Sequence, residues 1–84
     1  MTRLVYFAWV RERVGKPEEL AELPASIATV ADLLAWQAGR GEEYAYAFEN
    51  AGIIRVALDK RHARHDQPIA GAAEIAFFPP MTGG

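Results

Sequence analysis

The sequence predicts an α+β fold, a mixed sheet with one main helix packed on one face and a short second helix. Two stretches rich in β-branched and aromatic residues, 3–10 and 74–78, lie near the two ends of the chain and are typical of strands. Between them, residues 29–38 place apolar side chains at helical spacing. Strand-like runs at 18–23 and 53–58 flank this helix, so the elements are expected to share one core.

The first strand is expected over residues 3–10 (RLVYFAWV), with apolar side chains on both faces. One face needs a core, and the other, which carries Phe7, needs a second layer or a partner. Residues 11–17 contain glycine and proline and predict a turn. Residues 18–23 alternate loosely in polarity, and we expect them to form a strand that pairs with the first.

Thr29 is expected to cap the main helix, and Asp32, three residues later, approximates the partner residue of a capping box. Gly39 is expected to end this helix. A second, short helix is expected over residues 42–49, ended by residues 50–52. The apolar face of the main helix is made of Val30, Leu33, Leu34 and Ala38.

Residues 53–58 (IIRVAL) predict a strand, followed by a turn at residues 59–60 and a short strand at about 61–65. After a loop, the last strand spans residues 74–78. Pro79 ends it, because proline has no N–H to donate to a strand ladder.

A right-handed crossover lets the first and last strands lie side by side and parallel in the middle of the sheet. That arrangement is the β-grasp of ubiquitin-like domains. We therefore expect a β-grasp domain over residues 1–78, followed by an extended C-terminal tail over residues 79–84.

Composition limits the possible functions. The chain has 84 residues, enough for one domain, and a net charge of −2, which gives no electrostatic footprint for nucleic acid or for a membrane surface. It has no cysteine, which excludes a disulfide framework, a thiolate zinc site and a cysteine nucleophile. The early apolar run is too short to span a bilayer and lacks a cleavage site. We therefore expect a cytoplasmic protein.

The body of the domain offers no catalytic set of side chains. His62 and His65 would point to opposite faces of a strand, so exposed histidines at a sheet edge are favoured over a metal site, and no metal is expected. The adjacent carboxylates at 18–19 and 42–43 are expected to be solvated, and Gly39 with its neighbours looks like helix punctuation. No phosphate-binding loop or Ser/His/Asp set is present.

The tail is the remaining candidate for chemistry. Pro79 and Pro80 restrict their φ angles and favour an extended course, which lowers the entropy lost on docking. Gly83 and Gly84 carry no Cβ, so this segment can enter a narrow passage. The functional group at Gly84 is an α-carboxylate, which becomes reactive only when a partner activates it, for example as an acyl-adenylate.

Three stretches carry a resemblance to a known family: residues 7–15 (FAWVRERVG), 29–34 (TVADLL) and 74–84 (EIAFFPPMTGG). They resemble the opening strand and turn, the helix start and the terminal motif of the small subunits of molybdopterin synthase, a family of ubiquitin-like sulfur carriers. The chain departs from the family at Asp59, where asparagine is usual, and at residues 71–74 (GAAE), where Asp-Gly-Asp-Glu is usual.

The resemblance implies a mechanism. A ubiquitin-activating-like adenylyltransferase uses ATP to adenylate the Gly84 carboxylate, and a sulfur donor replaces AMP to leave a thiocarboxylate. The tail, with Gly83, then enters the large subunit of the synthase, where the sulfur attacks cyclic pyranopterin monophosphate. Two loaded small subunits serve each dithiolene, and a heterotetramer with the large subunit is expected. This chain would be a sulfur-donating subunit with no tightly bound cofactor.

A docking surface is also expected. If Leu4 and Tyr6 face the core, Phe7 faces out, and Phe78 does so on the neighbouring strand. Two exposed aromatic side chains form an apolar patch that a monomer would rarely keep without a partner. With the positions that the resemblance adds, the expected partner interface comprises Phe7, His62, Phe78, Pro79, Pro80, Met81 and Thr82.

Three other functions share this fold. The chain could be a sulfur carrier for thiazole synthesis or tRNA thiolation, a ubiquitin-like protein modifier joined to lysines, or a β-grasp interaction module with an inert terminus. The Phe-Phe-Pro-Pro stem at residues 77–80 favours the molybdopterin branch.

Overall fold

The computed structural model of the protein describes residues 1–80. Along the chain, a strand and a short helix come first, a second strand and two helices follow, and three strands complete the domain. The elements are β1 (Thr2–Tyr6), α1 (Ala8–Val14), β2 (Glu18–Ala21), α2 (Val30–Ala38), α3 (Glu42–Ala47), the 3-10 helix η1 (Ala51–Ile53), β3 (Arg55–Leu58), β4 (Arg61–Ala63) and β5 (Glu74–Phe78).

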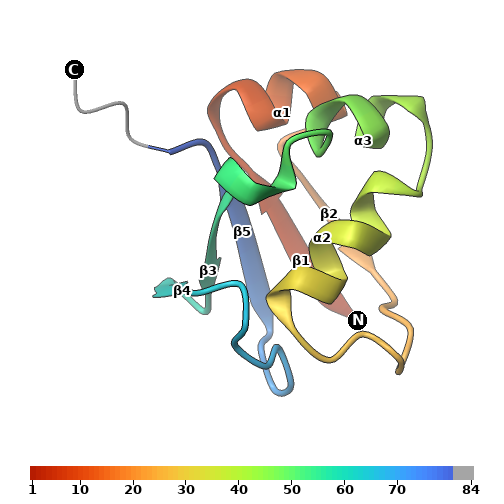
Figure 1. The fold of residues 1–84 in the computed structure, drawn as a ribbon. Coiled ribbons are helices and arrows are strands. Elements are labelled where there is room, and N and C mark those ends of the chain that lie inside the picture. Colours follow the sequence, from red (N-terminus) through yellow and green to blue (C-terminus); the bar gives the residue numbers. More distant parts are fainter. Residues whose placement is uncertain (81–84) are drawn as a thin grey trace.

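The five strands form one mixed sheet in the order β2-β1-β5-β3-β4. β1 and β5 are parallel neighbours in the middle of the sheet, and the other pairs are antiparallel. The three α-helices gather on one side of the sheet (Figure 1). The predicted α+β class and the β-grasp arrangement, with its central parallel pair, are therefore confirmed.

The core lies between the sheet and the helices. Tyr6, Phe48 and Phe77 pack at its centre, with ring centroids 5.4 to 6.5 Å apart. Burying aromatic rings contributes a large share of the hydrophobic stabilisation of so small a domain. The largest fully buried side chains also include Leu4, Leu33, Leu34, Ile54, Ile75, Val10, Val30, Val56 and the polar Gln37.

Helix α2 begins as the sequence predicts. Thr29 Oγ1 accepts a hydrogen bond from the Asp32 N–H at 3.2 Å, and Asp32 Oδ2 accepts one from the Thr29 N–H at 3.1 Å. This capping box satisfies two N–H groups that the helix itself leaves unpaired. Gly39 follows the last helical residue, as expected.

Helix α1 corrects the prediction of a strand over residues 3–10. β1 ends at Tyr6, and Ala8–Val14 is helical. Val10 and Val14, four residues apart, both lie in the core, and Gly15 closes the helix at φ +92°, a conformation that favours glycine. The β-branched and aromatic residues of this stretch favour a strand locally, but burying one helical face outweighs that preference.

Strand β2 pairs with β1 as predicted but presents an unexpected face. Leu20 lies outside and is 65% exposed, whereas Ala21 is buried. Glu19 pairs with Leu4, a core residue, and therefore points under the helices. The expectation that both carboxylates at 18–19 are solvated is wrong for Glu19, because hydrogen-bond donors from three other elements meet it there.

The β3–β4 hairpin turns at Asp59 and Lys60, both with positive φ (47° and 71°), as a two-residue hairpin turn requires. Asp59 Oδ1 also accepts hydrogen bonds from the Ala73 and Glu74 N–H groups, at 3.0 and 2.9 Å. Both strands are shorter than predicted, since η1 occupies residues 51–53 and β4 ends at Ala63.

Candidate functional site

The predicted tail starts at the end of the central strand β5. Phe78 is the last strand residue and pairs with Arg55 at the start of β3. Pro79 and Pro80 follow and are both half-buried. A chain that leaves a central strand through two prolines has its direction set by the sheet. Met81, Thr82, Gly83 and Gly84, predicted as tail and reactive terminus, lie outside the described residues.

Phe78 faces away from the helices, as the alternation along β5 requires, since Ile75 and Phe77 are buried and Phe78 is half-buried. His62 on the edge strand β4 meets it, with ring centroids 6.3 Å apart in an edge-to-face arrangement. His62 is exposed, as predicted. We use the term tail-root surface for Phe7, Arg55, His62, Phe78 and Pro80.

Phe7 lies beyond the end of β1 and is the residue before helix α1. Its N–H donates to the Phe77 carbonyl at 3.0 Å, which holds its backbone against the end of β5. Its side chain is 47% exposed. An aromatic side chain left this open at a strand end is the kind of group that a partner covers.

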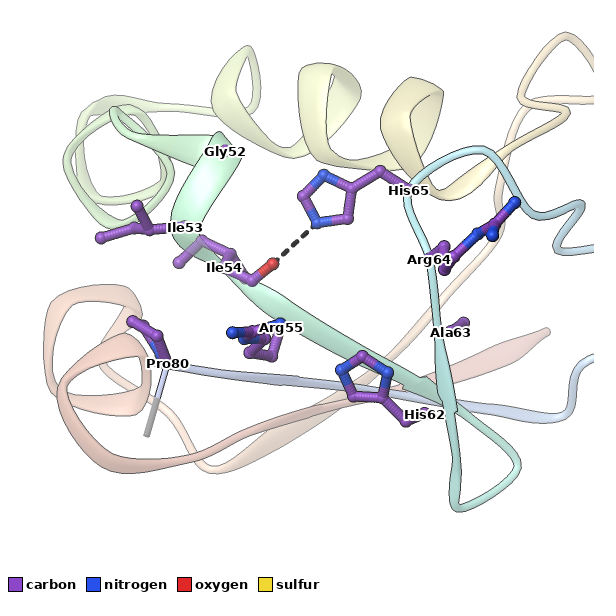
Figure 2. A pocket seen from close by; sticks show the side chains of 9 residues that line it. All are labelled: Gly52, Ile53, Ile54, Arg55, His62, Ala63, Arg64, His65 and Pro80. Atoms are coloured by element: carbon purple, nitrogen blue, oxygen red, sulfur yellow. Dashed lines mark hydrogen bonds between the residues drawn. The ribbon is translucent and has the colours of Figure 1, made fainter. Parts of the chain in front are cut away.

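A groove of about 410 Å³ opens beside Pro80 (Figure 2). It lies between the segment that leads into β3 and the segment that follows β4, where these two segments separate. His65 spans this gap, and its Nε2 lies 2.8 Å from the Ile54 carbonyl oxygen. The groove is lined by Gly52, Ile53, Ile54, Arg55, His62, Ala63, Arg64, His65 and Pro80.

His62 and His65, predicted as exposed histidines at a sheet edge, lie in different surroundings. His65 lies after β4, is half-buried and bonds to the Ile54 carbonyl, so it is not the exposed edge-strand histidine that the sequence suggested. Among residues 1–80, no three His, Cys, Asp or Glu side chains gather as metal ligands would. No helix within that part of the chain is long and apolar enough to cross a membrane.

A polar network on the helix side of the sheet is the feature that sequence reasoning missed. Arg40 binds Glu19 through two parallel hydrogen bonds of 2.9 and 3.0 Å. Tyr6 and Tyr44 donate their hydroxyls to the same carboxylate, at 2.7 and 2.8 Å. Gln37, fully buried, donates to the Tyr6 hydroxyl and accepts from Arg40. We call these five residues the Glu19 network.

The network fixes the ionisation of its members. Burial raises the pKa of Glu19, but hydrogen bonds from Arg40, Tyr6 and Tyr44 outweigh it and lower this pKa to about 2. Burial, together with the nearby Glu19 carboxylate, raises the pKa of Tyr6 well above its ordinary value. The network is therefore charged and fully paired at neutral pH, which suits a structural role and leaves no group poised to exchange a proton.

Two signals could have led to these residues. Arg40 stands between two glycines in the connection from α2 to α3. Glu19 lies on the same strand face as Ala21, so assigning Ala21 to the core would have placed Glu19 on the inner face as well. Arg55 of the groove carries no local signal. Only the pairing of β3 with β5 brings it beside Phe78.

Comparisons with known proteins agree with this geometry. The chain is 36% identical to the molybdopterin synthase sulfur carrier subunit of Escherichia coli (strain K12) and 32% identical to that of Haemophilus influenzae, in each case over 84 residues and 100% of both chains. The crystal structure of SAMP1 from Haloferax volcanii matches with a TM-score of 0.70 at 25% identity, covering 99% of this chain and 98% of the other.

A further solved structure, a candidate molybdopterin converting factor subunit 1 from Pyrococcus furiosus, matches with a TM-score of 0.65 at 24% identity, covering 95% and 97% of the two chains, and supports the fold. The sequence profile of the ThiS family matches residues 4–84. The match therefore includes both the described domain and the terminal motif. The resemblance to sulfur carriers found in the sequence is confirmed, and the chain belongs to the ThiS family.

Proposed function

We propose that this chain is the sulfur carrier subunit of a molybdopterin synthase. The observation that carries the proposal is the position of the terminal motif. It follows directly on the central strand β5, whose last residue, Phe78, emerges on the face without helices beside Arg55 and His62. Two full-length relatives named as such subunits share 36% and 32% of their residues with it.

The chemistry resides at Gly84. Its carboxylate attacks the α-phosphorus of ATP on an adenylyltransferase, which releases pyrophosphate and forms a mixed anhydride. A sulfur donor then displaces AMP and leaves a C-terminal thiocarboxylate. This sulfur attacks cyclic pyranopterin monophosphate, and hydrolysis of the resulting acyl group returns the free carboxylate. Two such cycles supply the two sulfurs of one dithiolene.

The domain acts as a rigid holder for that terminus. The acid–base groups of the transfer step would belong to the partner. The Glu19 network joins β1, β2, α2 and the connection to α3, which stiffens the helix side of the sheet. A rigid sheet fixes the direction in which the tail leaves β5. An intermolecular transfer step depends strongly on such positioning of the reacting group.

Two partners follow from this function. One is the large synthase subunit, which would bind the tail-root surface and accept the tail, in a heterotetramer of two small and two large subunits. The other is the activating adenylyltransferase, which binds the ATP, so this chain holds no cofactor tightly. Both reactions belong in the cytoplasm, where a chain without cysteine is at no disadvantage.

Intact mass after co-expression with the cognate activating enzyme tests the proposal. We expect a species in which one oxygen is replaced by sulfur, assigned to Gly84 by fragmentation, and sulfur transfer to cyclic pyranopterin monophosphate when the large subunit is added. An unchanged mass in the presence of ATP and a sulfur source contradicts the proposal.

Protein modification is the second candidate. It is favoured by the likeness to SAMP1, the small archaeal modifier protein 1 of Haloferax volcanii. The same spectra distinguish it, because a modifier yields a ladder of larger adducts on lysines. A carrier for thiazole synthesis or tRNA thiolation would show the thiocarboxylate but no transfer on the synthase large subunit.

A further inference from the structure

The groove beside Pro80 has a charge that the sulfur-carrier function leaves unexplained. Its lining holds two arginines and two histidines and no carboxylate. The whole chain has more acidic than basic residues, 11 against 9. A groove of the opposite sign therefore lies beside Pro80, near the start of the tail (Figure 2).

Two of these four side chains already have partners. Arg64 donates to both oxygens of Asp66, at 3.2 and 3.0 Å, and these hydrogen bonds raise the pKa of its guanidinium. His65 is held by the Ile54 carbonyl. In contrast, neither Arg55 nor His62 makes a side-chain hydrogen bond or ion pair within residues 1–80, and both are exposed.

Arg55 and His62 are continuous with the rest of the tail-root surface. Arg55 lies directly across from Phe78 in the β3–β5 ladder, and the His62 ring contacts the Phe78 ring. Pro80 lines the groove itself. A protein that accepts the tail must approach over these residues, so it also covers the groove.

The shape and the donors favour an extended occupant over a small anion. A small anion binds tightly where several free donors converge on one point, but here Arg64 is paired with Asp66 and His65 with the Ile54 carbonyl. The groove is open and runs along the separation of two chain segments. An extended segment can instead bring successive carboxylates to Arg55 and then to His62.

We propose that this groove binds an acidic segment of the large synthase subunit, the protein that receives the tail, with Arg55 as the contacting cation and His62 as a hydrogen-bond donor. The proposal rests on the sulfur-carrier function proposed above. Complementary charge of this kind raises the association rate and fixes the orientation of docking, which would deliver the tail to its entrance in one register.

The test measures binding of the cognate large subunit and of the cognate activating enzyme to wild type, Arg55→Glu and Arg55→Gln, by calorimetry at low and high ionic strength. We expect Arg55→Glu to weaken binding to the large subunit about ten-fold or more at low salt, with Arg55→Gln in between. The difference should shrink at high salt, because exposed charges are screened over about 10 Å at 0.1 M.

Arg61→Glu is the matched control. Arg61 is also an exposed arginine of the β3–β4 hairpin, without an ion pair in the described part of the chain, but it pairs with Leu58 at the end away from the tail. It should change affinity by less than about two-fold. Thermal melts followed by circular dichroism show that all variants are folded.

The outcomes separate the two proposals. If Arg55→Glu binds the large subunit like wild type while sulfur transfer proceeds, the acidic-segment proposal is overturned and the sulfur-carrier function stands. Equal losses for Arg55→Glu and Arg61→Glu also overturn it, since they would show a general charge effect. If wild type binds neither protein and gains no thiocarboxylate, both proposals fail.

Discussion

The Glu19 network and the tail-root surface are both rich in charged and aromatic side chains, yet they are built in opposite ways. In the Glu19 network one carboxylate meets a guanidinium and two hydroxyls, and Gln37 satisfies what remains. At the tail-root surface Phe7 is half exposed, and Arg55 and His62 have no polar partner among residues 1–80. The first region satisfies its polar groups within the domain, and the second leaves exposed the groups that the proposed interface would use.

This difference separates the residues expected to stabilise the fold from those proposed to bind a partner. A buried polar group that loses its partner carries a desolvation cost, so every member of the Glu19 network matters to folding. An exposed group that lacks a partner costs the free domain little, so it can be kept for an interface. The predictions below test this division, from the largest expected effect to the smallest.

Adding one alanine after Gly84 should abolish sulfur transfer and leave the fold and docking nearly unchanged. An extended chain advances about 3.3 Å per residue, so the carboxylate would pass the reacting atoms. Misplacement by about 1 Å can lower a rate about a hundred-fold. Molybdopterin formation and large-subunit affinity are measured in one reconstituted system, and turnover at the wild-type rate would show that Gly84 does not carry the sulfur.

Glu19→Ala should lower the free energy of unfolding by about 3 kcal/mol, because it leaves Arg40 and two hydroxyls without their acceptor. For a domain of this size that corresponds to a fall in Tm of about 12 °C or more. Glu18→Ala is the control, since that neighbouring carboxylate makes an exposed pair with Arg3 and should change stability by about 0.5 kcal/mol or less. Similar melts for the two variants would contradict the structural role of the network.

Acid should remove the stabilisation that the Glu19 carboxylate contributes. The folded pKa of Glu19, about 2, lies below its ordinary value of 4.5, so its stabilisation is fully present above that ordinary value and is lost as the pH falls toward about 2. The stability difference between wild type and Glu19→Ala should therefore narrow between pH 5 and pH 2. Denaturant titrations across this range measure it, and a constant difference would mean that the carboxylate charge is not what the network uses.

Phe78→Ala should leave the domain folded and weaken large-subunit binding by about 2 kcal/mol, roughly thirty-fold. The fold should survive because Ile75 and Phe77 provide the core contacts of β5, while Phe78 meets His62 outside. Calorimetry measures the affinity and circular dichroism the fold. Unfolding of the variant would assign Phe78 to the core instead of the docking surface.

Leu20→Thr should be nearly neutral, within about 0.5 kcal/mol in stability. Leu20 is a large apolar side chain on the outer face of β2, at the edge of the sheet, and is 65% exposed. Threonine keeps the strand propensity. A loss above 1 kcal/mol in the melt would show that the outer face of β2 is packed.

The sequence was sufficient for the elements that carry their own local signals. Strand β5 spans the predicted residues, the Thr29 cap and the Asp59–Lys60 turn are as expected, and the parallel central pair follows from chain order and handedness. Each of these depends on residues close in sequence or on a rule that few topologies break.

The failures have a common physical cause, which is contact between distant residues. Helix α1 forms because Val10 and Val14 can be buried together, although their stretch favours a strand by local preference. Glu19 is inside because donors from three other elements reach it. Arg55 belongs to the candidate site only through its pairing with Phe78.

The central pair of strands also has a consequence for how the chain is made. Arg3 pairs with Glu74, so β1 cannot pair with its parallel neighbour until β5 has left the ribosome. A chain that stops before β5 lacks Ile75 and Phe77 from its core and should stay unfolded and open to proteolysis. Folding thus depends on synthesis through β5, and a chain that stops earlier would not present a tail to its partners.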